Sequence, residues 1–161
     1  MQPTNDTELE AYQAIASVSD LDFVEELMLS EPQVDIPVSH HFGAGIYFRS
    51  GLVPAGVYVI GHAHKKPHMN MLTQGKLAIS SDGDVRIIEA PYLFQSDGGR
   101  KLFYVLEDAV LVNIFATEET DVAVIEEQFV DKTDTWRDAQ KRAENMRAID
   151  FAIQNYPERN L

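Results

Sequence analysis

The segment at positions 61–68 reads Gly-His-Ala-His-Lys-Lys-Pro-His and holds three of the chain's five histidines. His62 and His64 are two residues apart, so on a β-strand their side chains project from the same face. Pro67 forces a turn, after which a returning strand can bring His68 back to that face. Three imidazoles placed in this way could bind one metal ion, because neutral imidazole nitrogen is a common metal ligand.

A site of three histidines would leave coordination positions open to water or substrate, which is typical of catalytic metal sites. The candidate divalent metals are zinc, iron, nickel, manganese and copper, and the sequence does not select one of them. The chain has no cysteine, so thiolate ligands, disulfides and cysteine nucleophiles are excluded. The alternative is that His62, His64 and His68 only form hydrogen bonds in the protein interior. No other residue stands out as a catalytic acid, base or nucleophile.

The chain is strongly acidic. Its 161 residues include 26 acidic and 13 basic side chains, for a net charge of -13 with histidine neutral. Such a protein repels phosphate backbones, so we expect no nucleic acid partner. No apolar run reaches the roughly 18 residues of a membrane helix, and the polar first ten residues do not resemble a signal peptide. These features predict a cytoplasmic protein that is neither secreted nor inserted in a membrane.

The elements that must position the histidines lie in the middle of the chain, at 39–116. This stretch consists of short runs rich in Val, Ile, Tyr and Phe, separated by Gly, Pro and Asp-Gly, which is the pattern of an all-β domain. Asp82 and Gly83 predict a tight hairpin turn. A sandwich, jelly roll or small barrel could accommodate these strands. The candidate strands are 46–49, 57–60, 69–73, 76–80, 85–89, 92–95, 102–106 and 110–115.

Helical segments flank the β domain on both sides, at 1–38 and 117–161. The first segment predicts one helix that begins after Asn5 or Asp6, and a second that begins at a capping pair of Ser19 with Asp22 and ends before Pro32. In the last segment an acidic connector precedes a turn of helix around 122–127. These three stretches are the predicted domain organisation.

A longer helix is predicted to begin near Thr133 or Asp134 and to stop at Pro157. Its apolar residues are spaced three and four apart and therefore form one stripe. This stripe either packs against the chain's own β domain or clasps a neighbouring subunit of a homo-oligomer. Its members are Trp136, Ala139, Ala143, Met146, Ile149 and Ile153.

The spacing of Gly56, His62, His64, position 68 and Gly75 resembles the first motif of the cupin superfamily. In that motif a glycine is followed after five residues by His-x-His, then by a glutamate and a second glycine. The one departure is His68, which stands where most cupins have glutamate. Pro54-Ala55-Gly56 also resembles the usual lead-in to this motif. The resemblance covers about 40–116 and leaves both helical flanks unexplained.

The second cupin motif, Pro-x-Gly-x-x-His, is present here only in part. The stretch at 96–101 keeps Gly98 but has Lys101 where the motif's histidine, a further metal ligand, would stand. A cationic lysine does not bind metal. We therefore expect Lys101 to turn away from the site and leave three protein ligands.

The resemblance implies a mainly β fold, a cupin-type double-stranded β-helix or jelly-roll barrel, with short N-terminal helices and a C-terminal α-helix. It also implies a divalent metal held by His62, His64 and His68. The pattern is similar to small cupin-like proteins encoded by bacteriophages, whose function is undefined. One hypothesis is a metal-binding protein with a binding or assembly role, as a homo-oligomer or docked on a phage structural partner, in the host cytoplasm or the virion.

The other hypothesis is a cupin metalloenzyme, an oxygenase, isomerase or lyase that acts on a small polar or carboxylate substrate.

Several more residues could contribute to the site. His40 and His41 are adjacent, so at most one can face a barrel interior, and solvent exposure or a local hydrogen bond explains them without a role as fourth ligand. Arg49 could meet an anionic ligand, but we expect a surface ion pair. Tyr58, Asn70 and Tyr104 fall on candidate strands and could line a pocket, but the two aromatic residues are expected in the core.

Overall fold

The computed structural model describes residues 1–156, so the predicted helix stop at Pro157 lies outside the described residues. Most of this part of the chain forms β-strands. The elements, in chain order, are α1 (Asp6–Ala16), α2 (Leu21–Ser30), β1 (Val38–Gly43), β2 (Ile46–Val53), β3 (Tyr58–Ile60), β4 (Ala63–His64), β5 (His68–Ser81), β6 (Asp84–Glu89), β7 (Tyr92–Ser96), β8 (Leu102–Ala116), α3 (Val122–Phe129), β9 (Val130–Asp131) and α4 (Asp134–Asn155).

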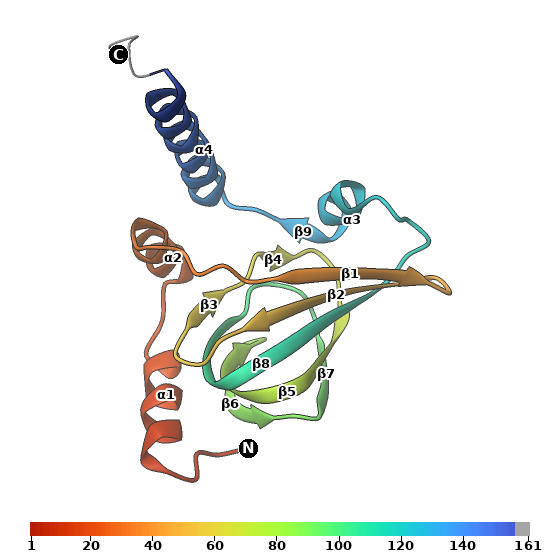
Figure 1. Cartoon of the computed structure of the whole chain (residues 1–161). Helices are drawn as coiled ribbons and strands as arrows, with labels where there is room; N and C mark the ends of the chain where they lie inside the picture. The colour runs from red at the N-terminus through yellow and green to blue at the C-terminus, as the bar shows by residue number, and fades with distance from the viewer. Residues whose placement is uncertain (157–161) are drawn as a thin grey trace.

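The strands build one curved antiparallel sheet, and the predicted mainly β, cupin-type jelly-roll barrel is confirmed (Figure 1). Its hydrogen-bonded order is β1-β2-β8-β5-β6, while β3 pairs with β8 and β7 pairs with β5. A second, two-stranded sheet joins β4 to β9. The two longest strands, β5 and β8, run antiparallel through the middle and carry the curvature.

Strand β5 is one long strand where the sequence predicted two. Register shifts between Leu72 and Leu77 mark bulges, which bend the strand without ending it. Gly75 lies at the bend with φ +84°, and a Cβ there would come within 2.7 Å of the carbonyl oxygen of Glu107. Only glycine fits this position. The two predicted strands at 102–106 and 110–115 are likewise merged, in β8.

Strand β1 was not predicted. It forms a hairpin with β2, and the turn contains Ala44 and Gly45, both at positive φ. Every residue of β1 except Val38 is exposed, so the strand lacks the inside–outside alternation that marks a half-buried strand. The predicted Asp82-Gly83 turn is confirmed, since both residues have positive φ between β5 and β6.

Two apolar clusters lie on opposite faces of the central strands. Leu77 and Ile79 point into the barrel, where they join Leu72, Ile88 and Val105. The intervening Ala78 faces outward and packs under α1 with Ala11, Ile15, Ile87 and Leu102. The alternation of β5 therefore divides the barrel interior from the face that α1 covers.

The N-terminal helices begin close to the predicted positions. Asn5 caps α1 by accepting a hydrogen bond from the backbone N–H of Glu8 at 2.9 Å. The cap of α2 is Asp20 rather than the predicted Ser19, because the Asp20 carboxylate accepts from the N–H of Phe23 at 3.0 Å. A carboxylate at an N-cap also interacts favourably with the helix dipole.

Helix α4 projects away from the barrel (Figure 1). Thr133 caps it as predicted, but none of its residues is buried. Met146, Ile149 and Ile153 are about half exposed, at 57%, 46% and 55%. The alternative in which this stripe packs against the chain's own β domain is therefore wrong for these three residues, whereas Ala139 and Ala143 are half-buried and α4 contacts α2. The clasp of a neighbouring subunit stays a prediction. None of the helices in residues 1–156 is long and apolar enough to cross a membrane.

Candidate functional site

Backbone pairing at one end of the barrel brings the histidine segment against Lys101. His64 pairs with Gly99 through two hydrogen bonds of 2.8 and 2.9 Å, and the N–H of Gly61 donates to the carbonyl of Lys101 at 2.8 Å. On the other side of β4, Lys65 donates its N–H to the carbonyl of Phe129 at 2.8 Å. Residues 61–65 are thus held from both sides.

Three nitrogens meet inside this end of the barrel. Nδ1 of His64 lies 2.7 Å from Nε2 of His68. Nζ of Lys101 lies 3.0 Å from the same His68 nitrogen and 3.4 Å from the His64 nitrogen. We call this group the nitrogen triangle.

The expectation that Lys101 turns away is wrong, since its side chain is only 5% exposed. Alternation explains the direction. Leu102 lies in the cluster under α1, whereas Phe103 lies in the interior core. Lys101 is two residues from Phe103 and therefore points inward with it.

Hydrogen bonding sets the protonation of His68. Its Nδ1 lies 3.2 Å from the carbonyl oxygen of Lys66. A carbonyl oxygen only accepts, so Nδ1 carries the proton and Nε2 of the neutral ring is an acceptor. Lys101 and His64 can then both donate to Nε2.

Burial keeps the histidines neutral. Burial, and then the positive charge of Lys101, lower the pKa of His64 to about 3. The same two causes lower the pKa of His68, and burial followed by the charge of Lys132 lowers the pKa of His62. Burial lowers the pKa of Lys101 to about 8 while Asp82 opposes this, so the amine is mainly protonated at pH 7.

His62 does not join the nitrogen triangle. It precedes the two-residue strand β4, so the strand alternation that would align it with His64 does not apply. Its ring packs edge-on against Trp136, with ring centroids 4.8 Å apart. In residues 1–156, no three His, Cys, Asp or Glu side chains converge to hold a metal ion. As placed, the residues do not fit the predicted three-histidine metal site, which stays a prediction.

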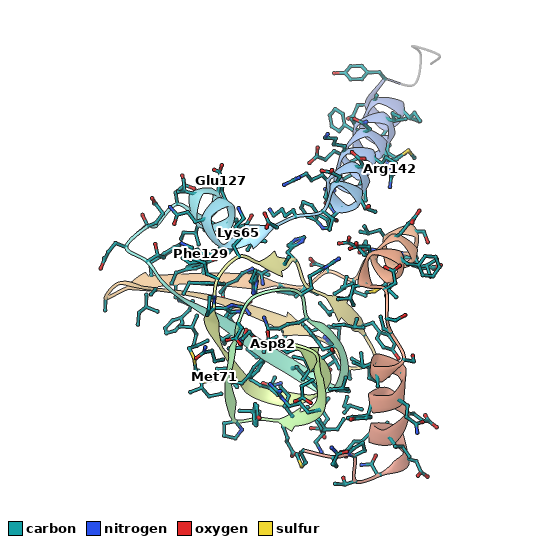
Figure 2. The ribbon with its side chains drawn as sticks, turned by 180° about the vertical axis from the view of Figure 1, so that it is seen from behind. Lys65, Met71, Asp82, Glu127, Phe129 and Arg142 are labelled. Atoms are coloured by element: carbon teal, nitrogen blue, oxygen red, sulfur yellow. The ribbon has the colours of Figure 1, made fainter. Side chains whose placement is uncertain are left out.

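A cavity of about 450 Å³ opens beside the triangle. Its polar wall includes Arg49, His62, His64, Lys101 and Asn113. Residues of α3 and β9 cover one side, where Figure 2 places Glu127 and Phe129 beside Lys65. The Lys65 ammonium donates a hydrogen bond of 2.7 Å to the carbonyl of Glu127 and so links the histidine segment to α3. Apolar side chains form much of the remaining wall: Val53, Val59, Phe103, Leu111, Phe115 and Phe129.

Arg49 and Asn113 face each other across β2 and β8 on the inner side of the sheet. The surface ion pair expected for Arg49 is wrong, because no carboxylate in the described part of the chain pairs with it. Asn113 donates to Oδ1 of Asn70 at 2.8 Å, and Asn70, which is fully buried, donates to Ser96 at 3.0 Å. This chain of hydrogen bonds fixes the Asn113 amide at the cavity wall.

The remaining candidates stand apart from the triangle. His40 forms a 2.7 Å hydrogen bond with the hydroxyl of Tyr47, which agrees with the expected local role, and His41 is exposed. Tyr58 and Tyr104 contact each other with tilted rings, whose centroids are 4.6 Å apart. Tyr58 is 44% exposed, so the expectation that it lies in the core is wrong. Lys101, Asn113 and Trp136 are the wall residues that sequence reasoning missed. The alternation of side chains along their strands could have predicted that Lys101 and Asn113 point into the barrel. No local sequence pattern predicts that Trp136 lines the cavity.

No family model matches the chain, and no curated protein matches it. Solved structures do resemble it. Ectoine synthase from P. lautus is 15% identical, with a TM-score of 0.47 over 65% of this chain and 83% of the other. KdgF from Halomonas sp. is 12% identical, with a TM-score of 0.46 over 55% and 86%. A cupin superfamily protein from Desulfitobacterium hafniense is 7% identical, with a TM-score of 0.44 over 57% and 86%. At these identities the likeness concerns the fold alone. The class that the molecule's own topology defines is a mainly antiparallel β-barrel of the jelly-roll type with helical extensions.

Proposed function

We propose that the protein binds a small anionic molecule, such as a carboxylate, in the barrel cavity. The observation that carries this proposal is that Arg49 and Lys101 line the same cavity while neither pairs with a carboxylate of the described residues. A guanidinium binds a carboxylate through two parallel hydrogen bonds, and an ammonium adds a third donor. The neighbouring Asn113 amide supplies a further polar contact.

The size and lining of the cavity support a small molecule rather than a macromolecule. A volume of about 450 Å³ lies in the range of small-molecule sites. Its apolar wall suits a ligand with a hydrocarbon body, while the cations meet its charged end. Glu126 also lines the cavity, but its carboxylate already pairs with Lys132 at 2.6 Å.

Local charge also supports the choice of an anion. The whole chain carries a net charge of -13, which disfavours anions at long range. Charges more than about 10 Å from the ligand are screened at ordinary ionic strength, whereas the cavity cations act within hydrogen-bonding distance. We therefore expect binding that depends on direct contacts and shows little electrostatic acceleration.

Metal binding through His62, His64 and His68, with or without metalloenzyme activity, is the second candidate. The observation that favours it is the convergence of the His64 and His68 nitrogens. It requires that Lys101 leave the triangle and that His62 turn away from Trp136. A phage origin and an assembly role have no feature of the barrel in their favour, although the exposed stripe of α4 is compatible with a homo-oligomer.

Trp136 provides the test of anion binding. It is the only tryptophan and lines the cavity, so a fluorescence titration with a panel of small carboxylates reports on this site. We expect saturable changes for at least one carboxylate and about tenfold or greater weakening in Arg49→Met, because a charge-assisted hydrogen bond contributes about 1.5–3 kcal/mol. The control is Arg142→Met, since Arg142 is exposed on α4 (Figure 2). Equal affinity in Arg49→Met and wild type would contradict the proposal.

A further inference from the structure

The nitrogen triangle holds an organic cation where the spacing of its residues predicted a metal. We propose that the ammonium group of Lys101 takes the place of a metal ion between His64 and His68, so that the barrel presents a built-in, metal-free cation to its cavity. This inference stands on the triangle itself and does not depend on whether the cavity binds a carboxylate.

The distances in the triangle are those of hydrogen bonds. Two nitrogens bound to one tetrahedral metal at about 2.1 Å each stand roughly 3.4 Å apart. The observed separation between Nδ1 of His64 and Nε2 of His68 is 2.7 Å, which is a hydrogen-bond distance and leaves no room for a bridging ion. Because Nε2 of His68 is the acceptor, His64 donates from Nδ1.

The chain holds Lys101 in this position firmly. Its carbonyl accepts from Gly61 at 2.8 Å, which ties position 101 to the histidine segment. The preceding residue, Arg100, donates to the carbonyl of Gly61 at 3.0 Å and forms an ion pair of 2.8 Å with the buried carboxylate of Glu25 on α2. These contacts fix the backbone on which the Lys101 side chain enters the barrel.

The ammonium also explains why the triangle needs no further ligand. One of its N–H groups donates to Nε2 of His68 at 3.0 Å, whereas Nδ1 of His64, which is itself a donor, lies 3.4 Å away and accepts nothing from it. The other N–H groups of the ammonium remain for groups in the cavity. A divalent ion at the same pair would lie next to this positive charge and be repelled. We therefore expect the wild-type protein to bind metal weakly.

The test is to place a histidine at position 101, where the second cupin motif has a metal ligand. Tag-free wild type, His64→Ala, Lys101→His and the double variant Lys101→His/His64→Ala are dialysed separately against Zn²⁺ and Ni²⁺, and bound metal is measured by mass spectrometry. We expect about one equivalent in Lys101→His, its loss in the double variant, and less than about a tenth of an equivalent in wild type. A wild type that binds about one equivalent, lost in His64→Ala, would overturn the inference, as would a folded Lys101→His variant that gains no metal.

A second variant covers the case in which Lys101→His does not fold. Lys101→Met keeps the length and burial of the side chain but removes its charge. We expect it to bind Ni²⁺ at least tenfold more tightly than wild type through the freed histidine pair. Equal Ni²⁺ affinity in the two proteins would show that the ammonium does not stand in the way of a metal, and would overturn the inference. The carboxylate titration at Trp136 is a separate measurement, so failure of the one is distinguishable from failure of the other.

Discussion

Acid should destabilise the barrel through its buried histidines before the carboxylate of Glu8 contributes. The pKa of His64 is about 3 in the folded chain and 6.5 in its ordinary environment. Between these pH values His64 is protonated in the unfolded chain but not in the folded chain. The contribution of His64 to the free energy of unfolding is therefore fully present above pH 6.5 and decreases as the pH falls toward 3. At pH 5 the loss from His64 alone is at most about 2 kcal/mol, from 1.5 pH units at about 1.4 kcal/mol each.

The choice of pH 5 separates this effect from that of Glu8. The hydrogen bond from Lys76 is the main cause that lowers the pKa of Glu8 to about 2, from an ordinary value of 4.5. The contribution of Glu8 is therefore lost only below pH 4.5. Burial also lowers the pKa values of His62 and His68, so both act in the same direction as His64.

Urea unfolding at pH 8 and pH 5, followed by Trp136 fluorescence, measures this loss. In His64→Asn the group that titrates is absent while a hydrogen-bond donor remains, so we expect the difference between the two pH values to shrink by up to about 2 kcal/mol. His41→Asn is the matched control, because His41 is exposed. If His64→Asn shows the same pH dependence as wild type, the account of a buried neutral His64 is wrong.

Two further predictions concern the helical flanks. Arg100→Met leaves the buried carboxylate of Glu25 without its cation, and we expect the free energy of unfolding in urea to fall by about 3 kcal/mol. The control is Arg137→Met, which removes an exposed ion pair and should lower the free energy of unfolding by less than about 1 kcal/mol. Equal losses in the two variants would contradict the role of Arg100. We expect α4 to bind a neighbouring subunit, so its loss should convert an oligomer to a monomer. Light scattering should show this lower molar mass after removal of all residues beyond Thr133, or in the double variant Ile149→Glu/Ile153→Glu. An unchanged molar mass would contradict the predicted contact between subunits.

Much of the barrel could be predicted from the sequence because its strands alternate and its turns carry Gly and Asp-Gly. The glycine pattern of the first motif also had a structural reason, since Gly75 lies where β5 bends against β8. The number of strands was harder to predict. A bulge changes the register of a strand without a local sequence signal that distinguishes it from a break, so β5 and β8 were each divided in two.

The site was predicted in part. His64 and His68 meet as expected, but His62 does not, because a strand of two residues is too short to carry the alternation that the prediction used. Lys101 was expected outside on the ground that a cation has no place among metal ligands. Its position two residues from Phe103 predicts an inward side chain, and this geometric signal outweighs the chemical argument. The direction of α4 depends on tertiary contacts that periodicity does not encode.

A crystal structure of the protein with the carboxylate that binds most tightly in the fluorescence panel tests the central claim most directly. We expect the carboxylate oxygens within hydrogen-bonding distance of the Arg49 guanidinium and the Lys101 ammonium, with the hydrocarbon part against Phe103 and Leu111. A carboxylate bound outside this cavity, with Arg49 and Lys101 untouched, would contradict the account.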